Sequence, residues 1–236
     1  MEAKRSRKEL VKRYTVLTVG LYLLALSVRL SVSTAMGTSP ISTIPNVMSC
    51  YFTQVSLGVH MFIWNMTLLL LQILILRKNF RPIQLLQIPL SFLFSAMLDF
   101  NGWLLRPLQP QTLVMKLVVL AAGCLLLGFS VFLSVRADVV MNSGEGIVKA
   151  IADTFRWEFV YVKVALDVLY VAVGFLLSFL FFRELRGVGV GTLLLAVCTG
   201  FVVKFFQDKL GNAVDRFLEK YKEDSDAVRD CTRNPH

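Results

Sequence analysis

Long apolar runs recur along the chain, separated by short polar stretches, and this pattern predicts six membrane-spanning helices. A helix needs roughly 17–25 mostly apolar residues to cross a hydrocarbon core about 30 Å thick. Six runs meet this requirement, at about 14–36, 56–76, 83–105, 112–135, 159–182 and 187–208. Because backbone groups in lipid must be hydrogen-bonded within their own segment, each run is expected to be an α-helix.

A polar interruption occurs twice, once in each half of the chain. The tetrad LSVR stands at 26–29 and again 107 residues later at 133–136, and Gly37 and Gly144 are separated by the same interval. Apolar residues follow each glycine on one helix face, namely Ile41, Ile44 and Met48 in the first half and Val148, Ile151 and Phe155 in the second. Each half is therefore predicted to contain one span, a break, a short amphipathic helix and two further spans.

Three spans per half is an odd number, so two repeated halves would enter the membrane from opposite sides. Such inverted repeats with interrupted helices occur in secondary transporters, where the breaks build a site near the midplane. The predicted fold is an all-α membrane protein of six transmembrane helices in two inverted three-helix repeats, each with a short broken or re-entrant half-helix. The predicted divisions are a basic cytoplasmic N-terminus (1–13), the two repeats (14–106 and 112–208) and a cytoplasmic C-terminal helix and tail (209–236). The tail beyond about 222 is expected to be disordered.

Composition supports a membrane protein and charge suggests its orientation. The 236 residues are 56% hydrophobic and 17% charged, whereas soluble domains average about 45–50% and about 25%. Six Lys and Arg precede the first apolar run, which is too long for a cleaved signal peptide and is expected to be retained. Basic residues also gather at 77–81 and in the C-terminal tail. The protein is therefore expected to lie in a bacterial plasma (inner) membrane with both termini in the cytoplasm.

The remaining chemistry argues against several classes of protein. The net charge of +9 is attributed to topology and to attraction for anionic lipid. Nucleic acid is not an expected partner, because the basic residues are dispersed and form no binding motif. The four cysteines lack metal-ligand spacing and are interpreted as packing residues, so neither a metal nor a cofactor is expected. Without a nucleophile elbow, a His/Glu metal motif or paired acids, an enzyme is not expected.

The two interruptions also carry a resemblance to a known family. Gly37-Thr38-Ser39-Pro40 follows the first span, Asn142-Ser143-Gly144-Glu145-Gly146 follows the fourth, and the third and sixth spans have polar ends. Over residues 10–210 this arrangement resembles the YczE/YyaS/YitT family of bacterial integral membrane proteins. That family is poorly characterised and usually described as candidate transporters, so the resemblance implies architecture better than substrate. The second turn has Ile147 where the first has Pro40, so the two turns need not be equivalent.

The first interruption has the features of a helix start. Ser39 suits the N-cap and Pro40 the first helical position. The chain is expected to leave the first span at Gly37 and begin a half-helix at Pro40, with its free N–H groups pointing into the protein. Beside the hydroxyls of Thr38 and Thr43, such an end can receive an anion or a carbonyl oxygen. An ordinary extracellular loop with a capped interfacial helix is the alternative.

The second interruption differs by a carboxylate. Glu145 occupies the place of Thr38, next to Gly144. If Ser143, Gly144 and Glu145 face the same cavity as the first turn, the site suits a solute with a cationic part, or a proton. Capping of the helix dipole by Glu145 is the alternative explanation.

Other polar residues fall inside or near the ends of the spans. Asn65 and Asp167 are predicted as lateral walls of the site, although Lys163 stands four residues before Asp167 and would explain it as a simple ion pair. Arg29 and Arg136 precede the two breaks and are predicted to brace the half-helices or pair with acids, with ligand binding as the alternative. Asp99 and Lys204, each followed by phenylalanine, are predicted as structural or coupling residues at the ends of the third and sixth spans.

Together these observations predict a secondary transporter that moves a small polar solute by alternating access around a midplane site between two broken helices. A proton or sodium ion is the candidate coupling ion, the lipid bilayer is the surrounding partner, and a homo-oligomer is compatible with the sequence. The alternative is the substrate-binding membrane subunit of a multi-component uptake complex with separate ATPases, which needs no inverted repeat.

Overall fold

The protein is all-helical in the part that the computed structural model describes, residues 7–139 and 141–233. Six helices are long and apolar enough to cross a membrane, which agrees with the prediction of a multi-pass protein. These candidate spans are Glu9–Ser33, Leu57–Asn79, Pro82–Leu104, Leu113–Ala137, Phe159–Phe182 and Val190–Leu218.

Eight α-helices and two 3-10 turns make up the described residues. They are α1 (Arg7–Ser33), α2 (Pro40–Tyr51), α3 (Leu57–Leu76), η1 (Arg77–Asn79), η2 (Pro82–Leu86), α4 (Gln87–Leu104), α5 (Leu113–Ala137), α6 (Ser143–Phe155), α7 (Phe159–Phe182) and α8 (Val190–Arg233).

A short helix follows a break in each half, as the sequence pattern predicted. α1 ends at Ser33, the backbone turns through positive φ at Ala35 and Gly37, and α2 begins at Pro40. In the second half α5 ends before Asp138, whose backbone adopts the left-handed helical conformation, and α6 begins at Ser143. With 12 and 13 residues, these helices are about 18–20 Å long and shorter than a bilayer-spanning helix.

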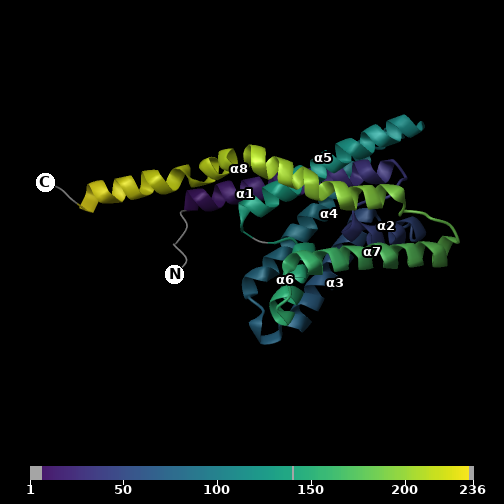
Figure 1. The fold of residues 1–236 in the computed structure, drawn as a ribbon, viewed down its shortest axis with the longest axis horizontal. Coiled ribbons are helices and arrows are strands. Elements are labelled where there is room, and N and C mark those ends of the chain that lie inside the picture. The colour runs from purple at the N-terminus through teal and green to yellow at the C-terminus, as the bar shows by residue number, and fades with distance from the viewer. Residues whose placement is uncertain (1–6, 140, 234–236) are drawn as a thin grey trace.

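Each short helix packs against spanning helices from both halves. α2 lies against α7 and α3, and α6 lies against α3 and α7. α1 packs along α5, while α4 contacts α1 and α8 contacts α5. In Figure 1, α6 and α2 lie beside opposite ends of α7, and the start of α1 and the end of α8 lie at the same end of the molecule.

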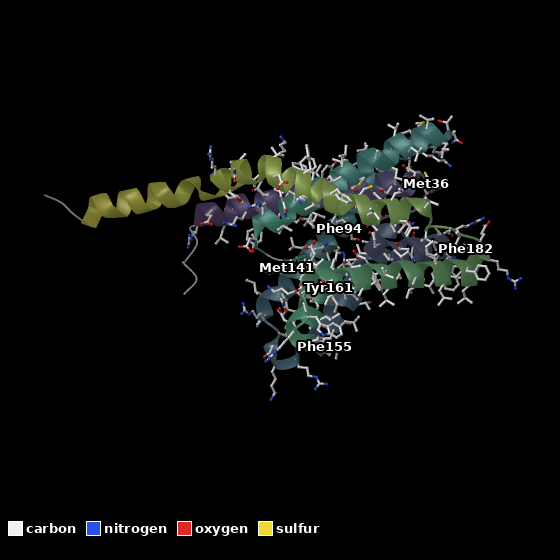
Figure 2. All side chains as sticks on the ribbon, in the orientation of Figure 1. Met36, Phe94, Met141, Phe155, Tyr161 and Phe182 are labelled. Carbon is white, nitrogen blue, oxygen red and sulfur yellow. The ribbon has the colours of Figure 1, made fainter. Side chains whose placement is uncertain are left out.

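Small residues allow α1 and α5 to approach closely at the centre of this arrangement. A Cβ on Gly20 of α1 would lie 3.1 Å from the Ser134 hydroxyl oxygen of α5, and the Ser27 hydroxyl donates to the Gly123 carbonyl at 2.7 Å. A Cβ on Gly123 would lie 2.9 Å from the Ser31 hydroxyl oxygen, so the glycine is needed for this close packing. The outward faces carry apolar side chains, which Figure 2 shows along α7 between Tyr161 and Phe182, as expected for helices in lipid.

Both end helices are longer than expected. α1 begins at Arg7 rather than near residue 14, and Glu9 pairs with Arg13 one turn later at 2.9 Å. α8 continues to Arg233, so the prediction of disorder beyond about residue 222 was wrong for the residues described. The reason is local, because neither glycine nor proline occurs between Gly211 and Arg233 to end the helix.

Candidate functional site

The first break is held in place by the start of α8. The Gly191 amide donates to the Met36 carbonyl at 2.9 Å, and the Thr38 amide donates to the Thr192 hydroxyl at 3.2 Å. Gly37 has φ +121°, and a Cβ there would lie 2.3 Å from the Thr192 hydroxyl oxygen. The conformation and the space therefore both require glycine at this position.

Buried hydroxyls surround the N-terminus of α2, but they are used differently from the prediction. Ser39 stands at the N-cap with Pro40 after it, yet its hydroxyl accepts nothing from the first turn and instead donates to the Ser42 hydroxyl at 3.0 Å. The Thr43 hydroxyl donates to the Ser39 carbonyl at 3.1 Å. Thr38 is fully buried, and its hydroxyl has no hydrogen-bond partner within the described residues. This turn therefore keeps one unused polar group in the interior.

The second break carries a cap that includes Glu145. Asn142 stands at the N-cap, and its side chain accepts from the Ser143 amide at 2.9 Å. Glu145 is three residues beyond the cap, and its carboxylate interacts with the Asn142 backbone and with the charge of Lys163. This spacing is that of a capping box. Burial raises the pKa of Glu145, while Lys163 and the Asn142 backbone lower it to a smaller extent.

Lys163 connects the second break to Asp167. Its ammonium group lies 2.7 Å from the Asp167 carboxylate one turn later on α7, which is the simple ion pair that the spacing allowed. Lys163 therefore forms its ion pair with Asp167, while its charge also favours the ionised form of Glu145. Asn65, on α3, is 2% exposed. Beside it, Trp64 stands edge-to-face with Tyr170 of α7 at 5.6 Å between ring centroids.

The starts of α2 and α6 meet through an apolar contact. A Cβ added to Gly144 would lie 2.0 Å from Cδ1 of Ile41, so the isoleucine side chain covers this glycine directly. Thr38 is placed beside the start of α8, whereas Ser143 is placed among residues of α3 and α4. Ile41 therefore occupies the region where a polar cavity between the two breaks was expected, and the two sets of polar groups lie on either side of it.

Ser143 is surrounded by buried polar residues that the sequence analysis did not identify. Gln72 of α3 and Gln87 of α4 exchange two amide hydrogen bonds of 3.3 and 3.2 Å, and Gln72 also donates to the Ser143 carbonyl at 3.0 Å. The hydroxyls of Ser91 and Ser143 are 3.4 Å apart. A small cavity beside Gln87, Asn142 and Ser143 leaves ≈ 10 Å³ for the centre of a water molecule, or about one water. A glutamine in the apolar run LLLLQILIL was the available signal.

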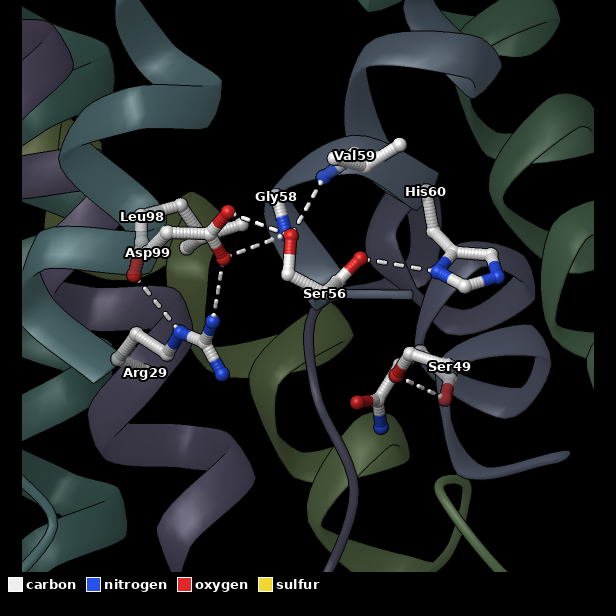
Figure 3. Close-up of polar contacts among 9 residues, drawn as sticks. Arg29, Ser49, Ser56, Gly58, Val59, His60, Leu98 and Asp99 are labelled. Carbon is white, nitrogen blue, oxygen red and sulfur yellow. Dashed lines mark hydrogen bonds and ion pairs between the residues drawn. The ribbon is translucent and has the colours of Figure 1, made fainter. Parts of the chain in front are cut away.

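Arg29 belongs to a polar cluster between α1, α3 and α4, shown in Figure 3. Its guanidinium donates to the Asp99 carboxylate at 2.9 Å and to the Leu98 carbonyl at 2.8 Å. Asp99 also accepts from the Gly58 amide at 2.9 Å and from the Ser56 hydroxyl at 2.5 Å, so it caps the N-terminus of α3. A single carboxylate thus holds three helices together.

Arg136 makes the corresponding ion pair in the second half, with Asp215 of α8 at 2.6 Å. Arg29 and Arg136 thus each bind an aspartate on the last spanning helix of their half. Glycines make room for both, since a Cβ on Gly102 would lie 2.6 Å from Cζ of Arg29 and one on Gly211 would lie 2.8 Å from Nη2 of Arg136. Lys204, which the sequence aligned with Asp99, is exposed on α8.

Among the described residues, no group of three or more His, Cys, Asp or Glu side chains could hold a metal ion.

A family profile matches residues 11–208, which is most of the chain, and its description is a family of unknown function, DUF6198. The chain belongs to DUF6198. Searches for similar proteins to this DUF6198 chain find no match among curated proteins and none among solved structures.

The paired carboxamides of this DUF6198 protein give a testable energetic prediction. Gln87→Leu is expected to lower the free energy of unfolding by about 1–3 kcal/mol, because it leaves the Gln72 carbonyl oxygen buried without a donor. The double variant Gln72→Leu/Gln87→Leu should be less destabilised than the sum of the single variants. Thermal unfolding in detergent measures the cycle, with the exposed Gln109→Leu as control. Strictly additive effects would contradict a coupled pair.

Proposed function

We propose that the protein is a secondary transporter that moves a small polar solute by alternating access between two inverted halves. In this proposal α2 and α6 are re-entrant half-helices, both termini are cytoplasmic and the membrane is the bacterial plasma (inner) membrane. The kinship to the YczE/YyaS/YitT family stays a prediction.

The pattern of helix contacts carries the proposal. Exchanging each helix of the first half for its counterpart in the second turns the α2–α7 contact into α6–α3, α2–α3 into α6–α7, and α1–α4 into α5–α8. All three counterpart contacts are present, and α1 packs against its own counterpart α5, but the close α3–α4 contact has no comparable counterpart between α7 and α8, so the exchange holds for part of the bundle. Such exchange symmetry is expected of two repeats related by a two-fold axis, which in transporters of this kind lies in the membrane plane.

The two arginine–aspartate pairs provide candidate gates. Arg13 near the start of α1 donates to the carbonyl of Ala137 at the end of α5, and Ser27 further along α1 donates to Gly123 nearer the start of α5, so these helices run antiparallel. Arg29 therefore lies about 24 Å further along α1, away from the Arg136 end of α5. In the proposed mechanism the Arg29–Asp99 pair opens with one side and the Arg136–Asp215 pair with the other. With both pairs formed, this conformation corresponds to a state closed on both sides.

The solute would bind where the half-helices meet α3 and α7. One side offers the unused hydroxyl of Thr38 beside that of Ser39, and the other offers Glu145 with Lys163 and Asp167. Ile41 would have to move from Gly144 to admit a solute, and because a β-branched side chain in a helix is held near one χ1 rotamer, this needs a χ2 change or a shift of α2 against α6. A proton is the favoured coupling ion in this proposal, because burial raises the pKa of the Glu145 carboxyl more than Lys163 lowers it.

Glu145→Gln is expected to remove a pH dependence and to keep the fold. Because the folded protein raises the pKa of Glu145 above its ordinary 4.5, the folded state binds the proton more tightly than the unfolded chain. The stability of the wild type should therefore fall as pH increases from about 4.5 through the raised pKa, and glutamine should remove this slope. Melting temperatures between pH 4 and 8 measure the effect. Parallel profiles for the two proteins would assign Glu145 a capping role alone.

Spin labels test alternating access directly. One pair of labels replaces Val55 and Trp103 near the Arg29–Asp99 cluster, and the other replaces Val135 and Phe205 near Arg136, all at exposed positions in a cysteine-free background. In liposomes, electron–electron distance measurements are expected to show two populations at each end, with one end wide when the other is narrow. Asp99→Asn should increase the wide population at its own end. A single fixed distance at both ends in wild type and variant would refute the transporter mechanism and favour a static membrane subunit.

A further inference from the structure

An exposed basic surface lies where the α3–α4 connection meets the end of α6. Its members are the exposed cations of segments 77–81 and 149–158, which are Arg77, Lys78, Arg81, Lys149 and Arg156. None of them forms an ion pair within the described residues. The same segments contain two acidic residues, Asp153 and Glu158, so the five basic residues leave this basic surface a net charge of +3.

The two segments lie on one side of the membrane and close to each other. The α3–α4 connection follows two candidate spans and the α6–α7 connection follows four. Because α2 and α6 are too short to cross, both connections lie on the side from which α1 starts. α6 packs along α3, and a Cβ on Gly146 would lie 2.6 Å from Oε1 of Gln72. Figure 1 shows the α3–α4 connection beside α6 at the lower end of the molecule.

The basic surface stands at the level of the lipid headgroups. The candidate span of α3 ends at Asn79, the next begins at Pro82 and that of α7 begins at Phe159, so both segments lie where hydrocarbon gives way to headgroups. Next to the cations, Phe155 and Trp157 are 57% and 63% exposed, with ring centroids 5.4 Å apart. Tryptophan favours this level of a membrane, so an apolar flank accompanies the positive charge.

We propose that the basic surface binds the headgroups of anionic phospholipids, in the leaflet nearest the start of α1. Arginine donates to phosphate oxygens and lysine supplies a point charge, while the rings of Phe155 and Trp157 would lie against the upper part of the acyl chains. A headgroup with a net negative charge complements the surface, whereas a zwitterionic headgroup brings a cation that the surface repels. Each basic residue near an anionic membrane strengthens binding about fivefold. The site is separate from the transport mechanism and does not depend on it.

Helix capping is the competing explanation for two of these cations. Arg77 and Arg156 stand at the C-caps of α3 and α6, where the helix dipole favours positive charge. Arg183 stands at the C-cap of α7, where its φ of 54° is close to the 58° of Arg156, and it is also exposed. Because it lies at the other end of α7 from the basic surface, Arg183 is a matched control with the same local role.

Fluorescence quenching of Trp157 tests the proposal at the site itself. The full-length protein carries Trp64→Phe and Trp103→Phe, which leaves Trp157 as its only tryptophan. Liposomes of phosphatidylcholine contain the same small fraction of either brominated phosphatidylglycerol or brominated phosphatidylcholine. We expect the phosphatidylglycerol to be enriched about tenfold or more around Trp157 and to quench more strongly, because several cations act together. Native mass spectrometry of the wild type, which needs no substitution, should show the same preference. Equal quenching by the two lipids would overturn the proposal.

Two variants locate the binding. Arg156→Gln should lower the enrichment of phosphatidylglycerol about fivefold, and the triple variant Arg77→Gln/Lys78→Gln/Arg81→Gln should bring it close to that of phosphatidylcholine. Arg183→Gln should leave the enrichment unchanged. An equal loss in Arg156→Gln and Arg183→Gln would assign the effect to helix capping, and unchanged enrichment in both basic-surface variants would place the lipid elsewhere. Either result would refute the site.

Free glycerol phosphate separates a lipid from a soluble anion. It carries the negative charge of the headgroup without acyl chains, so at millimolar concentration it should leave the quenching by brominated phosphatidylglycerol unchanged. Loss of quenching would show that the surface takes a soluble phosphate, and the proposal of a lipid site would fail. Added salt should weaken the enrichment, because solvent ions screen exposed charges. An enrichment that is independent of salt would contradict recognition by charge.

Discussion

Replacing Gly37 by alanine is expected to reduce the free energy of unfolding by about 3–5 kcal/mol. Two costs combine. The backbone at Gly37 has φ +121°, which L-residues rarely adopt, and the new Cβ would lie 2.3 Å from the Thr192 hydroxyl oxygen and 3.0 Å from the amide nitrogens of Gly189 and Thr192. Backbone atoms cannot rotate away as a side chain can, so the α2–α8 contact would have to open. Melting temperature and monodisperse yield in detergent measure the loss.

Gly200 provides a matched control for this substitution. It lies within α8, and a Cβ there would meet nothing within 4 Å. Gly200→Ala is therefore expected to leave stability unchanged or to increase it by up to about 1 kcal/mol, the difference in helix propensity. Equal melting temperatures for Gly37→Ala and Gly200→Ala would show that the first break is not held in the conformation described.

Asp99→Asn is expected to lower the free energy of unfolding by about 2–3 kcal/mol. The amide group can no longer accept from the Arg29 guanidinium, the Gly58 amide and the Ser56 hydroxyl together, and it leaves a largely buried cation without its partner. This loss is smaller than the roughly 3–5 kcal/mol expected when a fully buried ion pair is broken, because the Asp99 side chain is 36% exposed and solvent screens part of the interaction. Unfolding in mixed detergent measures the change.

The exposed Asp153 of α6 is the control for charge alone, and Asp153→Asn should change stability by less than about 0.5 kcal/mol. A double-mutant cycle with Arg29→Gln should then recover part of the Asp99→Asn loss, because the unpaired cation is removed as well. If Asp99→Asn is no more destabilising than Asp153→Asn, the cluster in Figure 3 does not hold α1, α3 and α4 together.

Local sequence signals predicted the elements of the fold well. The six spans follow from the length of the apolar runs, and the start of α2 follows from Ser39-Pro40, since both signals depend on neighbouring residues alone. The extent of α8 was missed because the polarity of the tail was interpreted as disorder, although its sequence has no helix breaker. Polarity reports on solvation, and a helix needs no apolar face when it lies outside the bundle.

Contacts within the candidate site were harder to predict, because they depend on helix rotation. Arg136 binds Asp215, which lies beyond the predicted end of the last span at 208, so no comparison of the two repeats could have paired them. Lys204 was singled out by its alignment with Asp99, yet it faces outward. Gln72 of α3 and Gln87 of α4 are separated by the connection between these helices, and they meet only because α3 and α4 pack side by side.

Because α8 is one continuous helix, a small tilt within the membrane is amplified at its C-terminal end. The helix passes from its candidate span, which ends at Leu218, to Arg233 without a break, so about 15 residues extend roughly 22 Å beyond the last spanning residue. A rigid arm of that length converts a tilt of about 10° within the membrane into a displacement of about 4 Å at its tip. The Arg136–Asp215 pair lies close to Leu218, where α8 leaves its candidate span. A small change at that ion pair would therefore produce a much larger movement at the end of α8.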